Sequence, residues 1–545
     1  MIERDQAPHA RVWAEMVVVM GATLAAYAWL LSPIMVDDVQ RYIEELQANR
    51  FFWDLGHVWM QPIAMAAYRV SGGALGIVST LEALNIAAVA LGCGIFYETL
   101  RRCEQSVWRS AAATLLVAMS FNLLSLGPTA HIKLLVLPPF ALALRHAVLW
   151  ETQASRGHDS TFHAVAAGIW LGLASNLLVS VLPAGVFVAV LMLLRARLSG
   201  QSWPAAVARA LPFGLALTLA GAATLLAAYG TATLSGSTTA TSLAGFVFGG
   251  LKEKQDLHVG VASLREMPFR FAFSLINNFA YLPSLGPLGR AWLWGMLPDM
   301  KPVLWSMIGQ LALAGLTFLA IGSTVVLAAR AAWKRSADVL MAGGFVLGAA
   351  AFSFYYNLND PEHWFQFTLP LVFLAMQVRR RWLDTLVLAV WLPAIVLVNL
   401  IGYGVPKATF ALEQRQQEIR SALEPNGLYV GYAAYPGEPD SSLLELGAVP
   451  RFRIDLVQVN EAARSNARLF TLLDEQIDAA HMRKGRVLVF RALDPYDWRG
   501  PVMQVTLNGL SPQQLQSHLT ARYRLSGPIV VGGFTAWTVE PVVKP

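Results

Sequence analysis

Two consecutive aspartates, Asp37 and Asp38, are the residues of this chain best placed to do chemistry. They stand where the first long apolar segment ends and an amphipathic segment begins, in LLSPIMVDDVQRYIEELQ. A carboxylate within hydrogen-bond reach of a hydroxyl acts as a general base. An aspartate at a helix start also often serves only as a cap, because the free amides there favour negative charge. A pair allows both roles, and it predicts chemistry on a lipid-borne substrate at a membrane surface.

The segment after the pair predicts a helix that lies flat in the membrane interface. Val39, Tyr42, Ile43 and Leu46 follow helical spacing, and the opposite face is polar.

Farther along the same loop, in FFWDLGHVWMQP, Asp54 adds an acid and His57 a titratable ring. Both are candidate substrate-binding residues. The alternative for His57 is an interfacial histidine that hydrogen-bonds to backbone.

Composition identifies a membrane protein. The chain has 545 residues, 55% of them hydrophobic and 14% charged, whereas soluble domains carry about 25% charged residues. The formal net charge of +6 comes from basic residues at the ends of apolar runs, as the positive-inside rule predicts. Nucleic-acid binding is therefore rejected. Only two cysteines are present, so no disulfide or cysteine metal site is expected.

About eleven apolar runs are long enough to suggest membrane-spanning helices. They lie near residues 13–34, 73–98, 110–127, 131–150, 162–176, 178–195, 210–231, 302–329, 338–356, 367–379 and 383–403. In the second run Glu82 and Asn85 stand one turn apart. Ionisable groups inside a membrane suggest function, and an interhelical hydrogen bond is the alternative for Asn85.

Five basic loops alternate with less basic ones in step with these runs, which predicts a cytoplasmic N-terminus. The expected architecture is a polytopic α-helical domain over residues 1–403, with outer loops at 35–72 and 232–301. Residues 404–545 alternate apolar runs with helical segments and predict an α/β domain on the periplasmic side. The Arg-rich, Ala-rich composition suggests a bacterial inner membrane.

Two further outer regions carry candidate substrate-binding residues. The loop LKEKQDLHVGVASLREMPFRFAF offers Arg265 and Arg270 for a lipid-linked phosphate. In NLNDPEHWFQF, Glu362 and His363 stand beside Trp364 at the outer mouth of the tenth run. Alternatively, the aromatic residues there belong to the belt of aromatic side chains at the membrane interface.

Taken together, these features resemble the GT-C superfamily, integral-membrane glycosyltransferases that use polyprenyl-phosphate-linked sugars. The resemblance covers roughly the first 400 residues. It rests on a first span that ends in an outer acidic residue, an interfacial helix, a Gly-His followed by a proline-containing apolar turn, the second run LEALNIAAVALGCGIFYETLRRC, and DPEHWFQFTLPLVFL. Family members commonly place the base on the first outer loop, which implies Asp37 or Asp38. Asp38 is preferred because it is nearer the helix.

The chain departs from the family between the third and fourth spans. Many members have an acidic residue there, whereas this chain reads SLGPTAHIKLLVLPP, with His131 and Lys133. Hard cations need oxygen ligands, so the departure weakens a metal site between two acidic loops and favours phosphate binding. No metal site or cofactor is predicted, although the sequence leaves a divalent cation open. The alternative for Lys133 is a side chain that extends to the interface.

The predicted function is transfer of a sugar, with inversion, from a polyprenyl-phosphate donor to a glycan, lipid or protein acceptor on the outer face of the membrane. The expected partners are that donor, the acceptor and membrane lipid. The alternatives are a transporter or flippase of a lipid-linked saccharide and a non-catalytic scaffold for envelope assembly. A polymerase or ligase of surface polysaccharide would share the same topology.

Overall fold

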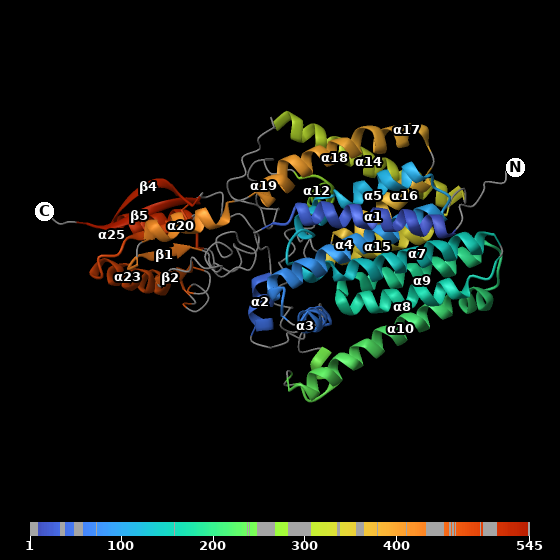
Figure 1. The fold of residues 1–545 in the computed structure, drawn as a ribbon, viewed down its shortest axis with the longest axis horizontal. Helices are drawn as coiled ribbons and strands as arrows, with labels where there is room; N and C mark the ends of the chain where they lie inside the picture. The colour runs from blue at the N-terminus through green and yellow to red at the C-terminus, as the bar shows by residue number, and fades with distance from the viewer. Residues whose placement is uncertain are drawn as a thin grey trace. The chain divides into compact units, whose positions relative to one another are not determined.

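Each of the eleven apolar runs is helical in the computed structural model (Figure 1). Seven helices in the described part of the chain are long and apolar enough to cross a membrane, and shorter apolar helices accompany them. The described residues are 9–32, 39–47, 58–71, 73–156, 158–236, 238, 240–247, 267–281, 307–334, 338–355, 364–378, 380–409, 411–423, 425–431, 452–456, 459, 463, 465–490, 492–493, 510–532 and 534–542.

The chain divides into a helical unit and an α/β unit. The helical unit comprises Met1–Leu31, Tyr42–Tyr281 and Leu311–Gly404, and the α/β unit comprises the rest. The first half of the helical part contains α1 (His9–Trp29), α2 (Val39–Gln47), α3 (Met60–Val70), α4 (Gly76–Arg102), α5 (Val107–Ala118), α6 (Phe121–Leu126), η1 (Ile132–Val136), α7 (Leu137–Ser155), α8 (Thr161–Leu177), η2 (Val179–Val181), α9 (Leu182–Leu198) and α10 (Trp203–Leu234). The second half contains α12 (Met267–Phe279), α14 (Met307–Lys334), α15 (Leu340–Tyr355), α16 (Phe365–Gln377), α17 (Arg381–Asp384), η4 (Thr385–Trp391), α18 (Leu392–Asn399) and η5 (Leu400–Gly404).

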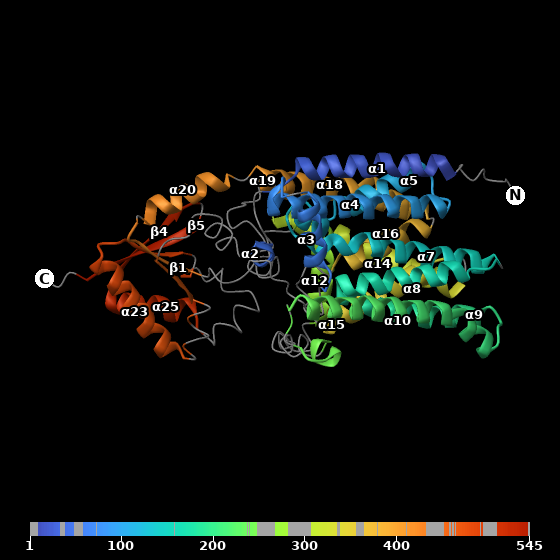
Figure 2. The ribbon, with the colours of Figure 1, turned by 60° about the horizontal axis from the view of Figure 1, so that its bottom comes forward.

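The long helices of this unit pack side by side. Helix α4 lies between α1 and α7, α8 lies between α7 and α10, and α15 packs on α9 and α16 (Figure 2). Small residues allow the closest approach, as is usual between membrane helices. A Cβ atom on Gly172 of α8 would stand 2.8 Å from the carbonyl oxygen of Leu217 on α10. Glycine is therefore needed where these two helices meet.

The helix expected after the aspartate pair is α2, which begins at Val39. Its four apolar residues are at most 8% exposed, so protein covers the face that was expected to rest on lipid. The prediction of the helix is confirmed, and the prediction that its apolar face meets the bilayer is wrong. Packing against protein buries the same apolar area without a membrane.

Ion pairs gather the basic loops at one end of the helical unit, here called the basic end. Arg101, in the last turn of α4, donates to Glu15 of α1 at 2.8 Å. Arg145 of α7 donates to Glu98 of α4 at 2.6 Å. The other pairs that join helices at this end are Arg109–Asp384, Arg156–Glu104 and Arg195–Asp338.

The α/β unit contains a mixed five-stranded sheet. The helices that belong to it are α19 (Val405–Ala408), α20 (Leu412–Leu423), α23 (Asn466–Met482) and α25 (Pro512–Arg522), and the strands are β1 (Leu428–Gly431), β2 (Phe452–Asp455), β3 (Val487–Phe490), β4 (Tyr523–Val531) and β5 (Phe534–Pro541). The strand order is β2-β1-β3-β5-β4. Strand β1 is parallel to both β2 and β3, whereas β5 is antiparallel to β3 and β4.

Alternation along the strands gives this sheet two apolar faces. Leu428 and Val430 pack with α23 and α25 on one face, and Tyr429 packs with α20 on the other (Figure 2). The sequence pattern predicted an α/β domain, and the sheet confirms it. The apolar run GPIVVGGFTAWTV is divided between β4 and β5 by a turn through Gly532, whose φ is +57°.

Candidate functional site

His131 and Lys133 lie on a short stretch, 126–136, that links α6 to α7 at the end of the helical unit opposite the basic end. We call this the site end. His131 is 0% exposed and Lys133 is 4% exposed. Protein therefore covers Lys133, and its alternative interpretation as a side chain that extends to the membrane interface is wrong. A cation held inside a helical membrane bundle is costly and commonly marks a functional site.

Asn85 of α4 fixes the first part of this stretch. Its Nδ2 group donates to the carbonyl oxygens of Leu126, Gly127 and Thr129 at 2.8, 3.0 and 3.2 Å. The expected hydrogen bonding between helical segments is thus confirmed for Asn85. An irregular backbone inside a membrane protein needs such donors, because neither water nor a helix satisfies its carbonyl groups.

Two further contacts hold the same stretch. The Thr129 hydroxyl accepts a hydrogen bond from the backbone N–H of His131 at 3.2 Å. Tyr27 of α1 lies against Gly127, where any Cβ atom would collide with the tyrosine ring. The Tyr27 hydroxyl donates to the carbonyl oxygen of Ala118 at 2.5 Å. Helices α1, α4 and α5 therefore position the backbone that carries His131.

Asn399, near the end of α18, forms a second amide clamp at the site end. Its Nδ2 group donates to the carbonyl oxygens of Met119 and Phe279 at 2.7 and 2.6 Å. Its Oδ1 atom accepts from the backbone N–H of Tyr281 at 2.8 Å. The clamp joins the ends of α5, α12 and α18. Sequence reasoning missed Asn399, although a lone amide in the apolar run AIVLVNLIGYG was the available signal.

Helix α12 adds two asparagines that differ in their pairing. Asn278 donates to the Thr368 hydroxyl of α16 at 2.8 Å. Asn277 is 6% exposed, and neither polar atom of its side chain has a hydrogen-bond partner in the described part of the chain. A buried amide without a partner costs about 1–3 kcal/mol. Asn277 therefore offers one donor and one acceptor to a polar ligand.

Most of the residues predicted for the site lie outside the described residues. These are Asp37, Asp38, Asp54, His57, Arg265, Glu362 and His363. Arg270 belongs to α12, but its side chain also lies outside the described part. Their roles stay predictions, and of the named candidates the structure brings together only His131 and Lys133.

Two described aromatic residues border the predicted loops. Trp364, next to His363, is 2% exposed and stacks on Phe367 with ring centroids 5.0 Å apart. It is packed within protein and is not a belt residue facing lipid. Trp59, just before α3, donates from Nε1 to the carbonyl oxygen of Thr224 at 3.1 Å.

No group of three or more His, Cys, Asp or Glu side chains converges as a metal site within the residues that the structure describes. The side chains of Asp37, Asp38 and Asp54 are not among the described residues, so this result does not test whether they bind a divalent cation.

No protein-family model matches the chain, and no curated protein is similar to it in sequence. Two solved structures show a weak likeness. Archaeal oligosaccharyltransferase AglB from Archaeoglobus fulgidus, in complex with an inhibitory peptide and a dolichol-phosphate, is 12% identical, with a TM-score of 0.48, over 94% of this chain and 73% of that one. ArnT from Cupriavidus metallidurans, bound to undecaprenyl phosphate, is 12% identical, with a TM-score of 0.30, over 96% and 97%.

At these scores neither likeness defines the fold, which follows from the elements described above. Those elements make the chain a multi-pass α-helical membrane protein with a C-terminal α/β domain.

Proposed function

We propose that this protein is a membrane glycosyltransferase that moves a sugar from a polyprenyl-phosphate donor to an acceptor hydroxyl or amine. The observation that carries the proposal is the buried stretch with His131 and Lys133, which amide clamps hold at the site end. Helix α3, which lies within the predicted first outer loop, packs on η1, the short helix that contains Lys133. That contact supports a site shared between the first outer loop and η1.

In the proposed reaction Asp38 or Asp37 accepts the proton of the acceptor. The acceptor atom attacks the anomeric carbon while the bond from that carbon to the phosphate oxygen breaks. The electron pair leaves with the lipid phosphate, and the configuration inverts. Lys133 stabilises the negative charge that develops on the departing phosphate.

The other cationic candidates, His131, Arg265, Arg270 and His363, extend this role. Asp54, His57, Glu362 and Asn277 hydrogen-bond the hydroxyl groups of the sugar. The site faces the periplasm of a bacterial inner membrane, with the N-terminus in the cytoplasm and the α/β domain outside, where it holds the acceptor or a partner protein.

An assay in lipid nanodiscs tests the proposal. Wild-type protein and the variants Asp37→Asn, Asp38→Asn and Lys133→Met are offered radiolabelled polyprenyl-phosphate sugars and a membrane acceptor extract, with and without chelator. Wild type is expected to release free polyprenyl phosphate. The Lys133 variant and one of the two Asn variants are expected to lose about a hundredfold or more in rate, the scale of one general acid–base contribution.

Asp159→Asn is the matched control for a capping role. Asp159 is an exposed aspartate that accepts the backbone N–H of Thr161 at 2.9 Å, at the start of α8. If the Asp37 and Asp38 variants both behave like Asp159→Asn, the pair only caps α2 and the catalytic assignment is wrong. If no donor is consumed but lipid-linked sugar changes leaflet in liposomes, the protein is a transporter. If neither occurs, the scaffold interpretation replaces both.

A further inference from the structure

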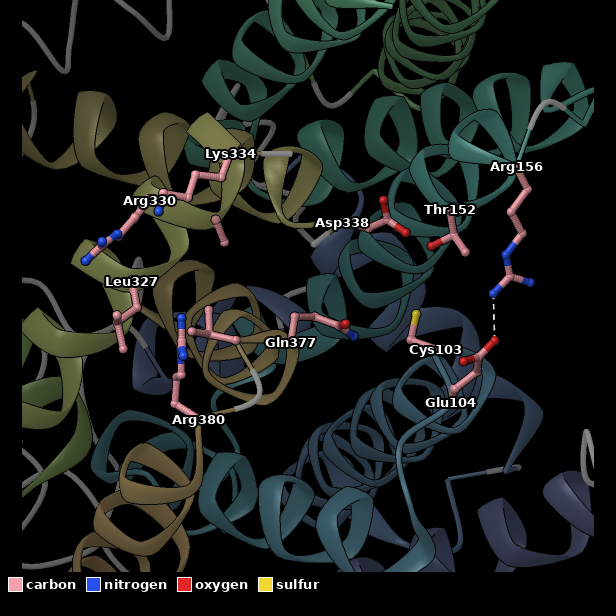
Figure 3. A pocket seen from close by; sticks show the side chains of 12 residues that line it. Cys103, Glu104, Thr152, Arg156, Leu327, Arg330, Lys334, Asp338, Gln377 and Arg380 are labelled. Carbon is pink, nitrogen blue, oxygen red and sulfur yellow. Dashed lines mark hydrogen bonds and ion pairs between the residues drawn. The ribbon is translucent and has the colours of Figure 1, made fainter. Parts of the chain in front are cut away.

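A cavity of about 410 Å³ lies at the basic end of the helical unit (Figure 3). The length of α7 separates it from His131 and Lys133. Its walls come from the loop after α4, the C-terminal ends of α7, α14 and α16, and the residue before α17. The predicted function makes no use of it.

Three cations line this cavity without carboxylate partners, and all three are exposed. Arg330 and Lys334 stand four residues apart on α14, which puts them on one helix face, and Arg380 precedes α17. Figure 3 shows all three on the same side of the view. In the described part of the chain none of them has an ion pair or a side-chain hydrogen bond. A group of exposed cations on one side of a cavity raises the local concentration of anions.

The two carboxylates of the cavity are already engaged by other groups. Glu104 accepts from Arg156 at 2.6 Å, as the dashed line in Figure 3 marks. Asp338 accepts from the Ser155 hydroxyl at 2.8 Å and lies 4.0 Å from Arg195. These acids therefore do not neutralise the cations on the α14 side.

A fourth group points to a ligand independently of charge. Gln377, the last residue of α16, lies in Figure 3 between the α14 cations and the Glu104 pair. Its Nε2 group is buried and has no hydrogen-bond partner in the described part of the chain. The backbone beside it is fixed, because Arg109 donates to the carbonyl oxygen of Met376 at 3.1 Å and binds Asp384 with both terminal nitrogens. In Figure 3 the amide of Gln377 is turned toward Cys103, on the side of the cavity away from the α14 cations, so its unused N–H donor lies deeper in the cavity than they do.

The surroundings of the cavity are those of a membrane interface. Trp333, beside Lys334, is 89% exposed, and Trp382, beside Arg381, is 53% exposed. Exposed tryptophans of membrane proteins gather at the level of lipid headgroups. Val326, about two turns before Trp333 on α14, is 66% exposed, which offers an apolar surface for acyl chains. Leu327 gives the cavity an apolar wall on the same helix.

We propose that this cavity binds the phosphate-bearing headgroup of an anionic membrane phospholipid. Arg330, Lys334 and Arg380 contact the phosphate oxygens, and Gln377 donates a hydrogen bond to the part of the headgroup that reaches farther into the cavity. The acyl chains lie along the exposed face of α14. Basic cavities between membrane helices bind anionic headgroups by this combination of charge and apolar surface.

Lipid titration of the full-length protein tests the proposal. The protein in detergent is titrated with short-chain phosphatidylglycerol, with phosphatidylcholine and with inorganic phosphate, and bound lipid is counted by native mass spectrometry. Phosphatidylglycerol is expected to bind at least about tenfold more tightly than phosphatidylcholine. Phosphatidylglycerol binding is expected to weaken about fivefold in each of the single variants Arg330→Ala, Lys334→Ala and Arg380→Ala. That is the effect expected of one basic residue near an anionic surface.

Two variants sharpen the result. Gln377→Leu keeps the charge and removes the amide, and a loss of affinity there assigns the donor. Arg209→Ala removes a cation of α10 outside the cavity, and it is expected to leave binding unchanged. Melting temperatures within about 2 °C of wild type show that the variants fold, because exposed substitutions change stability little.

Three outcomes would overturn the proposal. Equal affinity for phosphatidylglycerol and phosphatidylcholine would show that the cavity does not recognise the headgroup charge. Tight inorganic phosphate binding without phosphatidylglycerol binding would make the cavity a soluble-anion site. Undiminished binding by the triple variant of Arg330, Lys334 and Arg380 would place the lipid elsewhere.

Discussion

The two ends of the helical unit are held together by different chemistry. At the site end, the neutral amides of Asn85 and Asn399 bond to backbone carbonyl groups of irregular segments. At the basic end, carboxylates such as Glu98 pair with arginines. A neutral amide costs far less to bury than a charge. Amides therefore suit a buried stretch that must stay in place, whereas ion pairs suit helix ends near water and anionic headgroups.

The largest effect is expected from breaking the Asn85 clamp. Asn85→Leu leaves three buried carbonyl groups without their donor, which should cost about 3 kcal/mol of stability. Displacement of the stretch that carries Lys133 should also lower sugar transfer about a hundredfold, because misplaced groups lose rate steeply. Thermal unfolding and the nanodisc assay measure the two effects.

Asn176→Leu is the matched control for that variant. Asn176 of α8 also makes three hydrogen bonds, to the carbonyl oxygens of Gly172 and Gly221 and to the Thr224 hydroxyl. The Asn176→Leu variant should lose about as much stability as Asn85→Leu, and it should keep most of its transfer activity at a temperature where it is folded. Equal losses of activity in both variants would mean that Asn85 has no special link to the site.

At the basic end, Glu98→Gln tests the ion pairs. Glu98 is buried and contacts both Arg102 and Arg145, so its neutralisation should destabilise the protein by about 2 kcal/mol. Glu104→Gln, which breaks an exposed pair with Arg156, should cost about 0.5 kcal/mol. The midpoints of thermal unfolding measure both. The contrast between the ends would fail if Glu98→Gln also abolished transfer while remaining folded.

Asn277→Leu separates ligand binding from stability at the site end. The side chain has no protein partner in the described part of the chain, so its removal should leave stability unchanged or raise it. Donor KM should rise about tenfold, the scale of one hydrogen bond to a ligand. Asn278→Leu, which loses the bond to Thr368, should instead lower stability. An unchanged KM in the Asn277 variant would remove this residue from the site.

The smallest effect concerns Cys103, which lines the cavity at the basic end. Burial, with a contribution from Asp338 nearby, raises the pKa of this thiol to about 12. A raised pKa keeps the thiol protonated at neutral pH, so about a thousandfold less thiolate is present than in a free cysteine. Maleimide labelling of the folded protein at pH 7.5 should be slow and should accelerate as pH rises. Rapid labelling at pH 7.5 would show that the thiol is exposed.

Local sequence predicted the elements well. Each of the eleven apolar runs became a helix, because apolar length and periodicity report local structure directly. The spacing of Val39, Tyr42, Ile43 and Leu46 predicted α2, but not that protein would cover its apolar face. Periodicity defines a face and does not name what covers it.

The site could be predicted only in part. Lys133 was singled out from its position beside an apolar run, yet its burial depends on α3, α4 and α8, which pack around η1. Asn277 and Asn278 are adjacent and chemically identical, and only the placement of Thr368 makes one paired and the other not.

The sequence by itself determined that this protein lies in a membrane, which segments of it are helical, and that an α/β domain follows them. These properties depend on residues close together in the chain. Tertiary structure decided which carbonyl groups Asn85 and Asn399 satisfy, and that Arg330, Lys334 and Arg380 face one cavity. Such contacts join residues far apart in the chain, and a hydrogen bond or an ion pair exists only once packing has brought its two partners within about 3 Å.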